Sequence, residues 1–343
     1  MGEKPIRVAV VGLGFMGGMH IAALQSIPSA QLVAVYSRDE RKLSGDLSAV
    51  GGNLSGAGGV YDFSSVKKYR ELEDVLNDRE IDALDICLPT DLHTDVTVSA
   101  LQAGKDVLVE KPMALDLDSS LRMVEASRSA SRILMVAHVL RFLPEYQAVS
   151  DILRSGQYGA VRGGIFRRRC AAPAWSGWLG DPAKSGGGVF DLLIHDADIC
   201  LHLFGKPEFV SAIGYESLRN GIDIIGARLH YANNMTVEIA GGWHHPKTFP
   251  FTMEYTVVTD EGTIDFRHET RPPTLYARSG EESALPLGTR DGYAAEIEYF
   301  VQCCQTRQEP ALCPPVQSAE AVGLMKLLLQ SRGANGNKLP CNF

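Results

Sequence analysis

The pattern of hydrophobic residues predicts alternating strands and helices at the start of the chain. Residues 6–11 are apolar at nearly every position and rich in β-branched side chains, which is typical of a strand buried on both faces of a parallel sheet. The apolar period lengthens to nearly four over 16–26 and shortens again at 32–36, so a helix and a second strand follow. Further strands are predicted at 81–88, 106–109 and 133–136, and further helices at 39–50, 95–103 and 119–131. We expect residues 1–138 to form an α/β domain with a doubly wound parallel sheet.

After residue 138 the pattern changes to strands joined by turns. A helix at 144–155 precedes them, and Asn233-Asn234 and residues 260–262 are natural hairpin turns. Strands are predicted at 161–170, 209–215, 222–231, 235–241, 251–258 and 262–266, and helices at 189–203, 291–305 and 318–330. The length of 343 residues exceeds what one core usually organises. We therefore expect residues 139–343 to form a second, α+β domain with an antiparallel sheet.

Composition and charge narrow the classes of partner. The formal net charge of -8 argues against binding to nucleic acid or to anionic lipid, since both need a basic face. The seven cysteines show no C-x-x-C spacing and are interpreted as reduced thiols. The start of the chain lacks the regions of a signal peptide, and no stretch is apolar enough to span a bilayer. We expect a cytoplasmic protein with a small-molecule partner, and a flexible surface loop at the glycine-rich residues 51–59.

The segment after the first strand has the spacing of a dinucleotide-binding turn. Gly12, Gly14 and Gly17 fit G-x-G-x-x-G between the first strand and the first helix. In that setting the first glycine allows a tight turn, the second lets the pyrophosphate approach and the third lets helix and sheet pack closely. The helix N-terminus, at Phe15 and Met16, offers N–H groups to phosphate. This favours a Rossmann domain, with a turn that binds no ligand as the alternative.

Cofactor choice is expected to depend on the end of the second strand. An acidic residue there would hydrogen-bond the ribose 2′-OH of NAD. This chain instead has Ser37 and Arg38, a hydroxyl and a guanidinium that suit a 2′-phosphate. We therefore predict a preference for NADP over NAD. The alternative is that Arg38 is a solvated surface charge and Asp39 binds the ribose.

Two further groups follow central strands, at the edge where open α/β sheets bind ligands. Pro89, Thr90 and His93 come after the strand at 81–88, so their polar groups are candidates to line the dinucleotide. Glu110 and Lys111 come after the strand at 106–109, which places the Lys111 ammonium at the same edge. The following proline restricts Lys111 to extended conformations and permits a cis bond. On its own, a lysine after a strand is more often solvated than catalytic.

Residues 186–198 carry the highest density of candidate chemistry. Asp191 and His195 are four apart, so on a helix they share one face. A histidine suits the removal of a hydroxyl proton near neutral pH, and a nearby carboxylate orients it and stabilises its charged form. One alternative is a capped helix with a structural histidine. Another is a metal site formed by His195, Asp198 and His202, whose spacings also fall on adjacent turns.

Together these motifs resemble those of the Gfo/Idh/MocA family, named after glucose-fructose oxidoreductase and inositol dehydrogenase. The resemblance covers the chain in family order, at 12–17 with His20, at Pro89-Thr90 with His93, at Glu110-Lys111-Pro112, at 138–144 and at 186–195. It implies a Rossmann domain followed by a domain whose large, mostly antiparallel sheet mediates dimer or tetramer contacts. It also implies that Lys111, Asp191 and His195 are the catalytic set and that no metal is required. Position 37 is a serine, whereas an acidic residue at this position is typical of family members that bind NAD.

The implied reaction is reversible oxidation of a secondary alcohol in a sugar, cyclitol or related polyol. His195 would accept the hydroxyl proton while hydride moves to the nicotinamide, and Lys111 would hydrogen-bond the reacting oxygen. Asp191 would tune both groups. Candidates for substrate contacts are Arg141, Arg167, Arg169, Trp175 and Trp178. Arg167 and Arg169 could equally be solvated strand residues or form interface salt bridges. Trp175 and Trp178 could equally pack in the core or form an oligomer contact.

Two rival functions remain open at this point. Some members of the family are glycosidases that oxidise, eliminate and re-reduce their substrate with a tightly held dinucleotide, so that the net reaction is hydrolysis. The other rival is a non-catalytic dinucleotide-binding protein. The joint presence of Lys111, Asp191 and His195 argues against the second, because a sensor needs only the residues of the first domain.

Overall fold

The computed structural model describes residues 4–52, 58–174 and 176–343, which form two compact units. The first unit contains the described residues up to Val139 together with Asp291–Ala319, and the second contains Leu140–Arg290 and Glu320–Phe343. The sequence analysis placed residues 291–319 in the second domain, whereas the structure places them in the first unit. Division into functional domains at 1–138 and 139–343 stays a prediction. No helix among the described residues is both long enough and apolar enough to cross a membrane.

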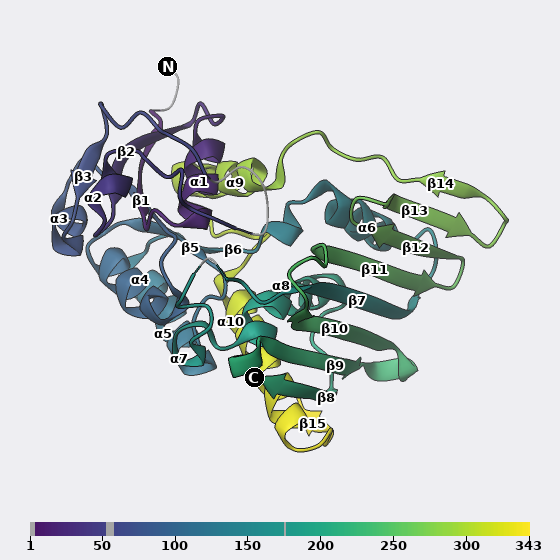
Figure 1. Ribbon diagram of the computed structural model, residues 1–343. Helices are drawn as coiled ribbons and strands as arrows, with labels where there is room; N and C mark the ends of the chain where they lie inside the picture. The colour runs from purple at the N-terminus through teal and green to yellow at the C-terminus, as the bar shows by residue number, and fades with distance from the viewer. Residues whose placement is uncertain (1–3, 53–57, 175) are drawn as a thin grey trace. The chain divides into compact units, whose positions relative to one another are not determined.

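The first unit is built on a six-stranded parallel sheet, which confirms the predicted Rossmann arrangement (Figure 1). Its strands lie in the order β3-β2-β1-β4-β5-β6, and every neighbouring pair is parallel. Their bounds are β1 Ile6–Val11, β2 Ala30–Tyr36, β3 Lys67–Tyr69, β4 Ala83–Ile86, β5 Asp106–Glu110 and β6 Leu134–Ala137. The central strands are buried along their length, as the continuous apolar runs predicted.

The helices of the first unit match the predicted ones except near β2. They are α1 Phe15–Leu24, α2 Glu40–Leu43, α3 Leu72–Asn77, α4 His93–Gln102, α5 Leu117–Ala130 and α9 Gly292–Thr306, with the 3-10 turn η1 at Thr90–Leu92. The helix predicted at 39–50 ends at Leu43 because Gly45 takes a φ of 99°, and a Cβ there would lie 2.0 Å from the Tyr61 carbonyl oxygen. The short elements β3 and α3 were not predicted. Residues 53–57 of the predicted loop at 51–59 lie outside the described residues.

The late helix α9 packs against α1, β1 and β5 of the first unit (Figure 1). Its buried side chains include Ile297, Phe300 and Val301, each no more than 1% exposed. This apolar stripe is why residues 291–319 belong to the first unit.

The second unit contains a nine-stranded sheet that is antiparallel except for one pair, as predicted. Its order is β14-β13-β12-β11-β7-β10-β9-β8-β15, and only β7 and β10 run parallel. The strands are β7 Val161–Ala171, β8 Phe209–Ser217, β9 Ile222–His230, β10 Thr236–His245, β11 Thr252–Thr259, β12 Gly262–Arg267, β13 Arg271–Ala277, β14 Glu282–Ala284 and β15 Leu339–Pro340. The two predicted hairpin turns join β9 to β10 and β11 to β12.

Helix α8 (Gly188–Phe204) lies on one face of this sheet, over β7, β9 and β10. The other helices are α6 Pro144–Ser155, α7 Pro182–Ser185 and α10 Pro315–Gly333, with 3-10 turns η2 Val139–Arg141, η3 Leu218–Asn220 and η4 Ala232–Asn234. Side chains on the α8 side, such as Phe166, are buried, whereas Ile165 and Arg167 on the opposite side of β7 are exposed. The sheet therefore has one covered face and one open face.

Candidate active site

The three glycines of the first turn occupy positions with different steric limits. Gly12 has a φ of 107°, and a Cβ there would lie 2.5 Å from the Cys87 carbonyl oxygen. A Cβ on Gly17 would lie 2.0 Å from the carbonyl oxygen of Gly12. Gly14, in contrast, has no atom within 4 Å of its Cβ position. The first and third glycines are thus needed for the turn and the helix packing, while the second faces open space.

The N-terminus of α1 is suited to bind an anion. Gly14 is the N-cap and contributes no side-chain hydrogen bond, and the first turn contains no acidic residue. The N–H groups that follow, at Phe15 and Met16, lie at half-exposed positions. Together with the open space at Gly14, these N–H groups fit the pyrophosphate of a dinucleotide.

The end of β2 presents one arginine to solvent. Ser37 is buried, and its hydroxyl accepts the Asp39 N–H at 3.1 Å. Arg38 is exposed and forms no ion pair with any residue that the structure describes. The Asp39 carboxylate, the alternative partner for a ribose, caps α2 by accepting the Arg41 N–H at 2.9 Å. The helix-capping bonds from the Arg41 and Lys42 N–H groups use only Oδ1 of Asp39, so the choice between Ser37 with Arg38 and Asp39 as contacts of the ribose stays a prediction.

His93 is buried beside two backbone carbonyls, and its expected place along the dinucleotide stays a prediction. It is 1% exposed, and its Nδ1 and Nε2 each lie 2.8 Å from a backbone carbonyl, of Pro112 and of Leu88 respectively. The neighbouring Thr90 is also buried, but its hydroxyl has no hydrogen-bond partner among the described residues. Pro89 is half-buried ahead of η1. Thr90 therefore remains a candidate for cofactor contact.

Glu110 is likewise engaged inside the first unit. One carboxylate oxygen lies 3.1 Å from Nε2 of His20, and the other accepts the Lys111 N–H at 3.0 Å. Burial opposes its ionisation, but the hydrogen bond and the charge of His20 outweigh burial and lower the pKa of Glu110. Both carboxylate oxygens of Glu110 thus have partners inside the unit, and a contact with the dinucleotide stays a prediction. The Lys111–Pro112 bond, for which the sequence permitted either isomer, is cis.

His20 lies at the centre of a buried cluster that sequence reasoning did not find. Its Nδ1 is 2.9 Å from both carboxylate oxygens of Asp85, and Cys87 is 3.6 Å away. Burial disfavours the imidazolium, yet the charge of Asp85 outweighs this and raises the pKa of His20 well above its usual value. Burial also raises the pKa of the Cys87 thiol. One ligand atom from each of His20, Asp85 and Cys87 lies within 4.8 Å of the others, so the cluster has metal-ligand spacing.

Asp191 and His195 lie on the half-exposed side of α8, one turn apart. Their neighbours Leu192, Leu193 and Ile194 are buried. The sequence pattern thus predicted correctly that the two residues share a helix face.

The N-terminus of α8 is held by a residue that the sequence analysis missed. The buried Asp223 of β9 accepts the Val189 N–H at 2.8 Å, and its other oxygen accepts from Arg332 of α10 at 2.5 Å. Arg332 also donates to Glu216 at 2.6 Å. Asp223 is 34 positions from Val189 and 109 positions from Arg332. At such separations no local sequence pattern indicates a contact.

Arg141 occupies the interior rather than a substrate pocket. Its fully buried guanidinium makes two hydrogen bonds to Asp198, at 2.9 and 2.7 Å. His202, the third member of the alternative metal site, has its Nε2 3.0 Å from Arg154. Both Asp198 oxygens are engaged, so the alternative of a metal at His195, Asp198 and His202 gains no support.

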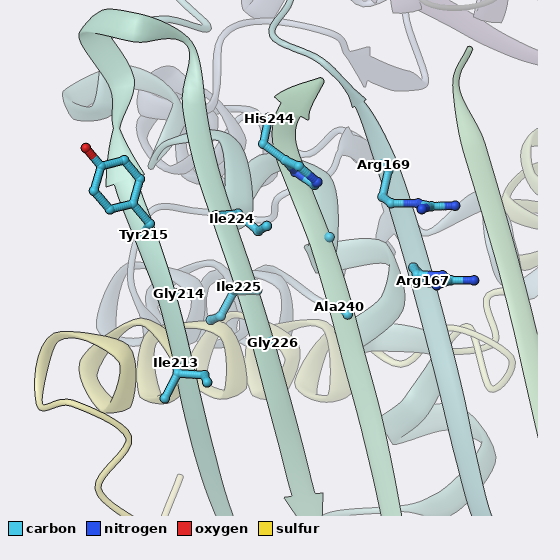
Figure 2. A pocket seen from close by; sticks show the side chains of 11 residues that line it. Arg167, Arg169, Ile213, Gly214, Tyr215, Ile224, Ile225, Gly226, Ala240 and His244 are labelled. Carbon is cyan, nitrogen blue, oxygen red and sulfur yellow. The ribbon is translucent and has the colours of Figure 1, made fainter. Parts of the chain in front are cut away.

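Arg167 and Arg169 point to the open face of the sheet, away from α8 (Figure 2). Both pair with Glu254, at 2.5 and 3.0 Å. They border a shallow hollow of about 630 Å³ whose other lining residues are Ile213, Gly214, Tyr215, Ile224, Ile225, Gly226, Ala240, Gly241 and His244. This position favours the surface or interface alternative over a substrate contact beside Asp191. Trp178 is half-buried in the turn before α7, and Trp175 lies outside the described residues.

The candidate residues therefore form two groups, one in each unit. Lys111 lies in the first unit, where Glu110 and Pro112 flank it. Asp191 and His195 lie in the second unit. That all three act on one substrate stays a prediction from the resemblance.

Comparison with known proteins identifies similar chains for both units. Residues 6–138 match the family described as "Oxidoreductase family, NAD-binding Rossmann fold", and residues 146–265 match "GFO/IDH/MocA C-terminal domain". The scyllo-inositol 2-dehydrogenase (NAD(+)) of Bacillus subtilis (strain 168) is 29% identical over 326 residues, covering 90% of this chain and 89% of that protein. The D-xylose 1-dehydrogenase (NADP(+)) 2 of Haloferax volcanii is 26% identical over 328 residues, covering 92% and 94%.

Solved structures share the fold along nearly the whole chain. The structure titled "Levoglucosan dehydrogenase, complex with NADH and levoglucosan" matches with a TM-score of 0.84 at 17% identity, covering 99% of this chain and 100% of that one. At this identity the match shows a common fold alone.

Proposed function

The chain belongs to the Gfo/Idh/MocA oxidoreductase family, and on that premise we propose that it moves hydride between a nicotinamide dinucleotide and a secondary alcohol or ketone of a sugar or cyclitol. The observation that carries this proposal is the open space at Gly14 before the uncapped N-terminus of α1. A turn that bound no ligand would not need that space. The relatives named for inositol and xylose oxidation support the substrate class.

The first unit is proposed to bind the cofactor. The N–H groups after Gly14 would hold the pyrophosphate, and Ser37 with Arg38 would contact the 2′ position of the adenosine ribose. Thr90, whose buried hydroxyl has no hydrogen-bond partner among the described residues, supports a contact along the carboxyl edge of the sheet. When bound, the nicotinamide ring supplies the hydride acceptor or donor.

The protein's own part in the reaction is proton transfer and charge stabilisation. We assign to His195 the role of general base, which takes the hydroxyl proton onto a ring nitrogen. Asp191, one turn before it on α8, would orient the ring and stabilise its charged form. Lys111 would donate a hydrogen bond to the reacting oxygen and stabilise negative charge there.

Replacement of His195 tests this assignment. His195→Ala should lower kcat by roughly 10²- to 10⁴-fold, the usual contribution of a positioned base, with little change in dinucleotide affinity. His202→Ala is a matched control, because His202 is the next half-buried histidine on α8 and contacts Arg154. Near-normal turnover in His195→Ala, or loss of wild-type activity with a chelator, would contradict the role. Sugar release without accumulation of reduced cofactor would favour the glycosidase alternative.

A preference for NADP is the finer part of the proposal. Arg38→Ala should weaken NADP binding by about 1.5 to 3 kcal/mol, roughly ten- to a hundredfold, and leave NAD binding nearly unchanged. Arg41→Ala is the control, because Arg41 is an exposed arginine three positions on that pairs with Asp46. Titration of both cofactors by fluorescence measures the two affinities. Tighter binding of NAD than of NADP by the wild type would refute the preference.

We also propose that two copies of the chain associate through the open face of the nine-stranded sheet. Ile213 and Tyr215 on this face are 66% and 61% exposed, and Ile165 is 48% exposed. Exposed apolar residues that recur on one sheet face, here on β7 and β8, favour an interface. Light scattering after size exclusion should show a dimer or tetramer that Ile213→Asp dissociates. The control Val60→Asp changes an apolar residue of the first unit that is 80% exposed, and it should leave the assembly intact.

A further inference from the structure

Two buried histidines contact the turn at residues 110–112 from opposite sides. His93 reaches its C-terminal end, with Nδ1 2.8 Å from the Pro112 carbonyl oxygen, while Nε2 is 2.8 Å from the Leu88 carbonyl. The ring thereby bridges the segments that follow β4 and β5. Burial lowers the pKa of His93, and the two carbonyls only partly offset this. In the neutral ring one nitrogen donates to one of the two carbonyls.

His20 reaches the other end of the turn through Glu110. Its Nε2 is 3.1 Å from one Glu110 oxygen, and the second oxygen accepts the Lys111 N–H at 3.0 Å. On its other side the ring is held by Asp85 at 2.9 Å. His20, Asp85 and Glu110 are each no more than 5% exposed, whereas Lys111 at the end of this chain of contacts is half-exposed.

The turn itself has no regular backbone pairing to hold it. The parallel pairing of β5 with β6 ends at Glu110 and Ala137. The next backbone donor, at Lys111, bonds to a side chain, Pro112 has no N–H, and the Pro112 carbonyl faces His93. Glu110 and His93 therefore contact the backbone on either side of the Lys111 side chain, and His20 contacts Glu110.

Burying an ionic cluster is a costly way to fill a core. Apolar side chains of similar volume are often equally stable or better. A cluster of this kind is justified where it fixes the orientation of a particular segment, and here that segment is the one that carries Lys111.

We propose that His20 and His93 are positioning residues for Lys111, which fix the two ends of the turn so that its ammonium group is held in place for the reaction. This inference rests on the proposed role of Lys111.

Three variants of the turn and one control test the proposal. Glu110→Gln keeps the shape of the side chain but removes the negative charge that pairs with His20 and one of the two carboxylate oxygens. His93→Phe keeps a ring and removes both nitrogens, and His93→Gln retains one donor. The control is Lys105→Met, just before the opposite end of β5, where Lys105 donates to the carbonyls of Asp78 and Ile81 at 2.6 and 2.8 Å.

Hydrogen exchange of the cofactor-free protein gives a readout independent of activity. Exchange in a peptide covering 108–114 should be at least tenfold faster in Glu110→Gln and His93→Phe than in the wild type. Lys105→Met should lower the melting temperature without this local effect. Unchanged exchange at 108–114 in both turn variants would overturn the proposal.

Kinetics then show whether the histidines act through Lys111. Glu110→Gln and His93→Phe should each lower kcat about 10- to 100-fold, the range typical of residues that orient a functional group, with less than about a threefold change in cofactor affinity. His93→Gln should recover part of the loss, and it replaces His93→Phe if that variant does not fold. In a Lys111→Ala background the same changes should have less than about a threefold further effect.

The proposed function of Lys111 and the positioning role of the histidines can be refuted separately. Normal kcat in Lys111→Ala would refute the proposed function of Lys111. A large loss in Lys111→Ala, combined with equal losses from the turn variants in both backgrounds, would leave that function standing and refute the positioning role.

Discussion

Alanine at Gly14 and alanine at Gly17 should separate ligand binding from folding. Both positions receive the same added methyl group. At Gly17 this carbon would lie 2.0 Å from the Gly12 carbonyl oxygen, whereas at Gly14 it would meet no atom within 4 Å. The Gly12 carbonyl belongs to the tight turn, where Gly12 has a φ of 107°, so it has little freedom to move away.

The two variants should differ in whether they lose folding stability or dinucleotide affinity. Alanine inside a helix gains about 1 kcal/mol over glycine, but overpacking against backbone costs about 1 to 3 kcal/mol and occasionally more. We expect Gly17→Ala to lose about 2 kcal/mol net, which lowers the melting temperature by about 4 to 8 °C. Gly14→Ala removes a favourable N-cap glycine and should cost less than about 1 kcal/mol. Its methyl group should instead displace the pyrophosphate from the N–H groups and weaken dinucleotide binding about 10- to 100-fold.

Thermal unfolding without cofactor and fluorescence titration with dinucleotide measure the two effects. Gly14→Ala should unfold near the wild-type temperature and bind poorly. Gly17→Ala should unfold early. Wild-type affinity in Gly14→Ala would show that the dinucleotide does not approach the backbone there, and an unchanged melting temperature in Gly17→Ala would show that α1 does not pack as described.

Three further predictions concern buried or paired carboxylates. Asp223→Asn should weaken the hydrogen bond to the Val189 N–H at the start of α8 and lower kcat more than dinucleotide affinity. Steady-state kinetics and cofactor titration measure the two effects, and an equal loss of both would contradict the prediction. Arg141→Met should destabilise the protein by about 3 to 5 kcal/mol in denaturant unfolding, because it leaves Asp198 buried without its partner, and Arg141→Met with Asp198→Leu should recover much of this. Burial opposes ionisation of Asp78, but hydrogen bonds from Lys67, the Glu80 N–H and Tyr69 outweigh the effect of burial and lower the pKa of Asp78 to about 2. Its contribution to stability should be complete above about pH 4 and lost as the pH falls through 2, a loss absent from Asp78→Asn in acid titration.

The sequence predicted the elements whose signal is local. Continuous apolar runs identified the central parallel strands, and the spacing of Asp191 and His195 placed both on one helix face. The glycine spacing identified the turn, in which Gly12 and Gly17 leave no room for a Cβ while Gly14 does. Short elements such as β3, with three residues, carry too few positions for a period to show.

The residues that sequence reasoning misplaced are those whose partners are distant in the chain. Arg141 reads as an exposed cation until Asp198, 57 positions later, is seen to neutralise it. His93 and Glu110 were placed at the correct edge of the sheet, but their polar atoms point to carbonyls and to His20 inside the unit. Proximity to the edge follows from topology, whereas the direction of a side chain depends on partners that the local pattern does not contain.

The return of α9 to the first unit affects how this protein is made on the ribosome. Residues up to Val139 supply all six strands of the parallel sheet, but the surface that receives Ile297 and Phe300 stays uncovered until the chain has been synthesised past residue 306. During that interval the second unit's sheet emerges while the first still exposes apolar surface. A gene fragment ending near residue 139 would encode the same unfinished state permanently, so an expressed dinucleotide-binding fragment needs residues 291–319 supplied in trans or joined by a linker.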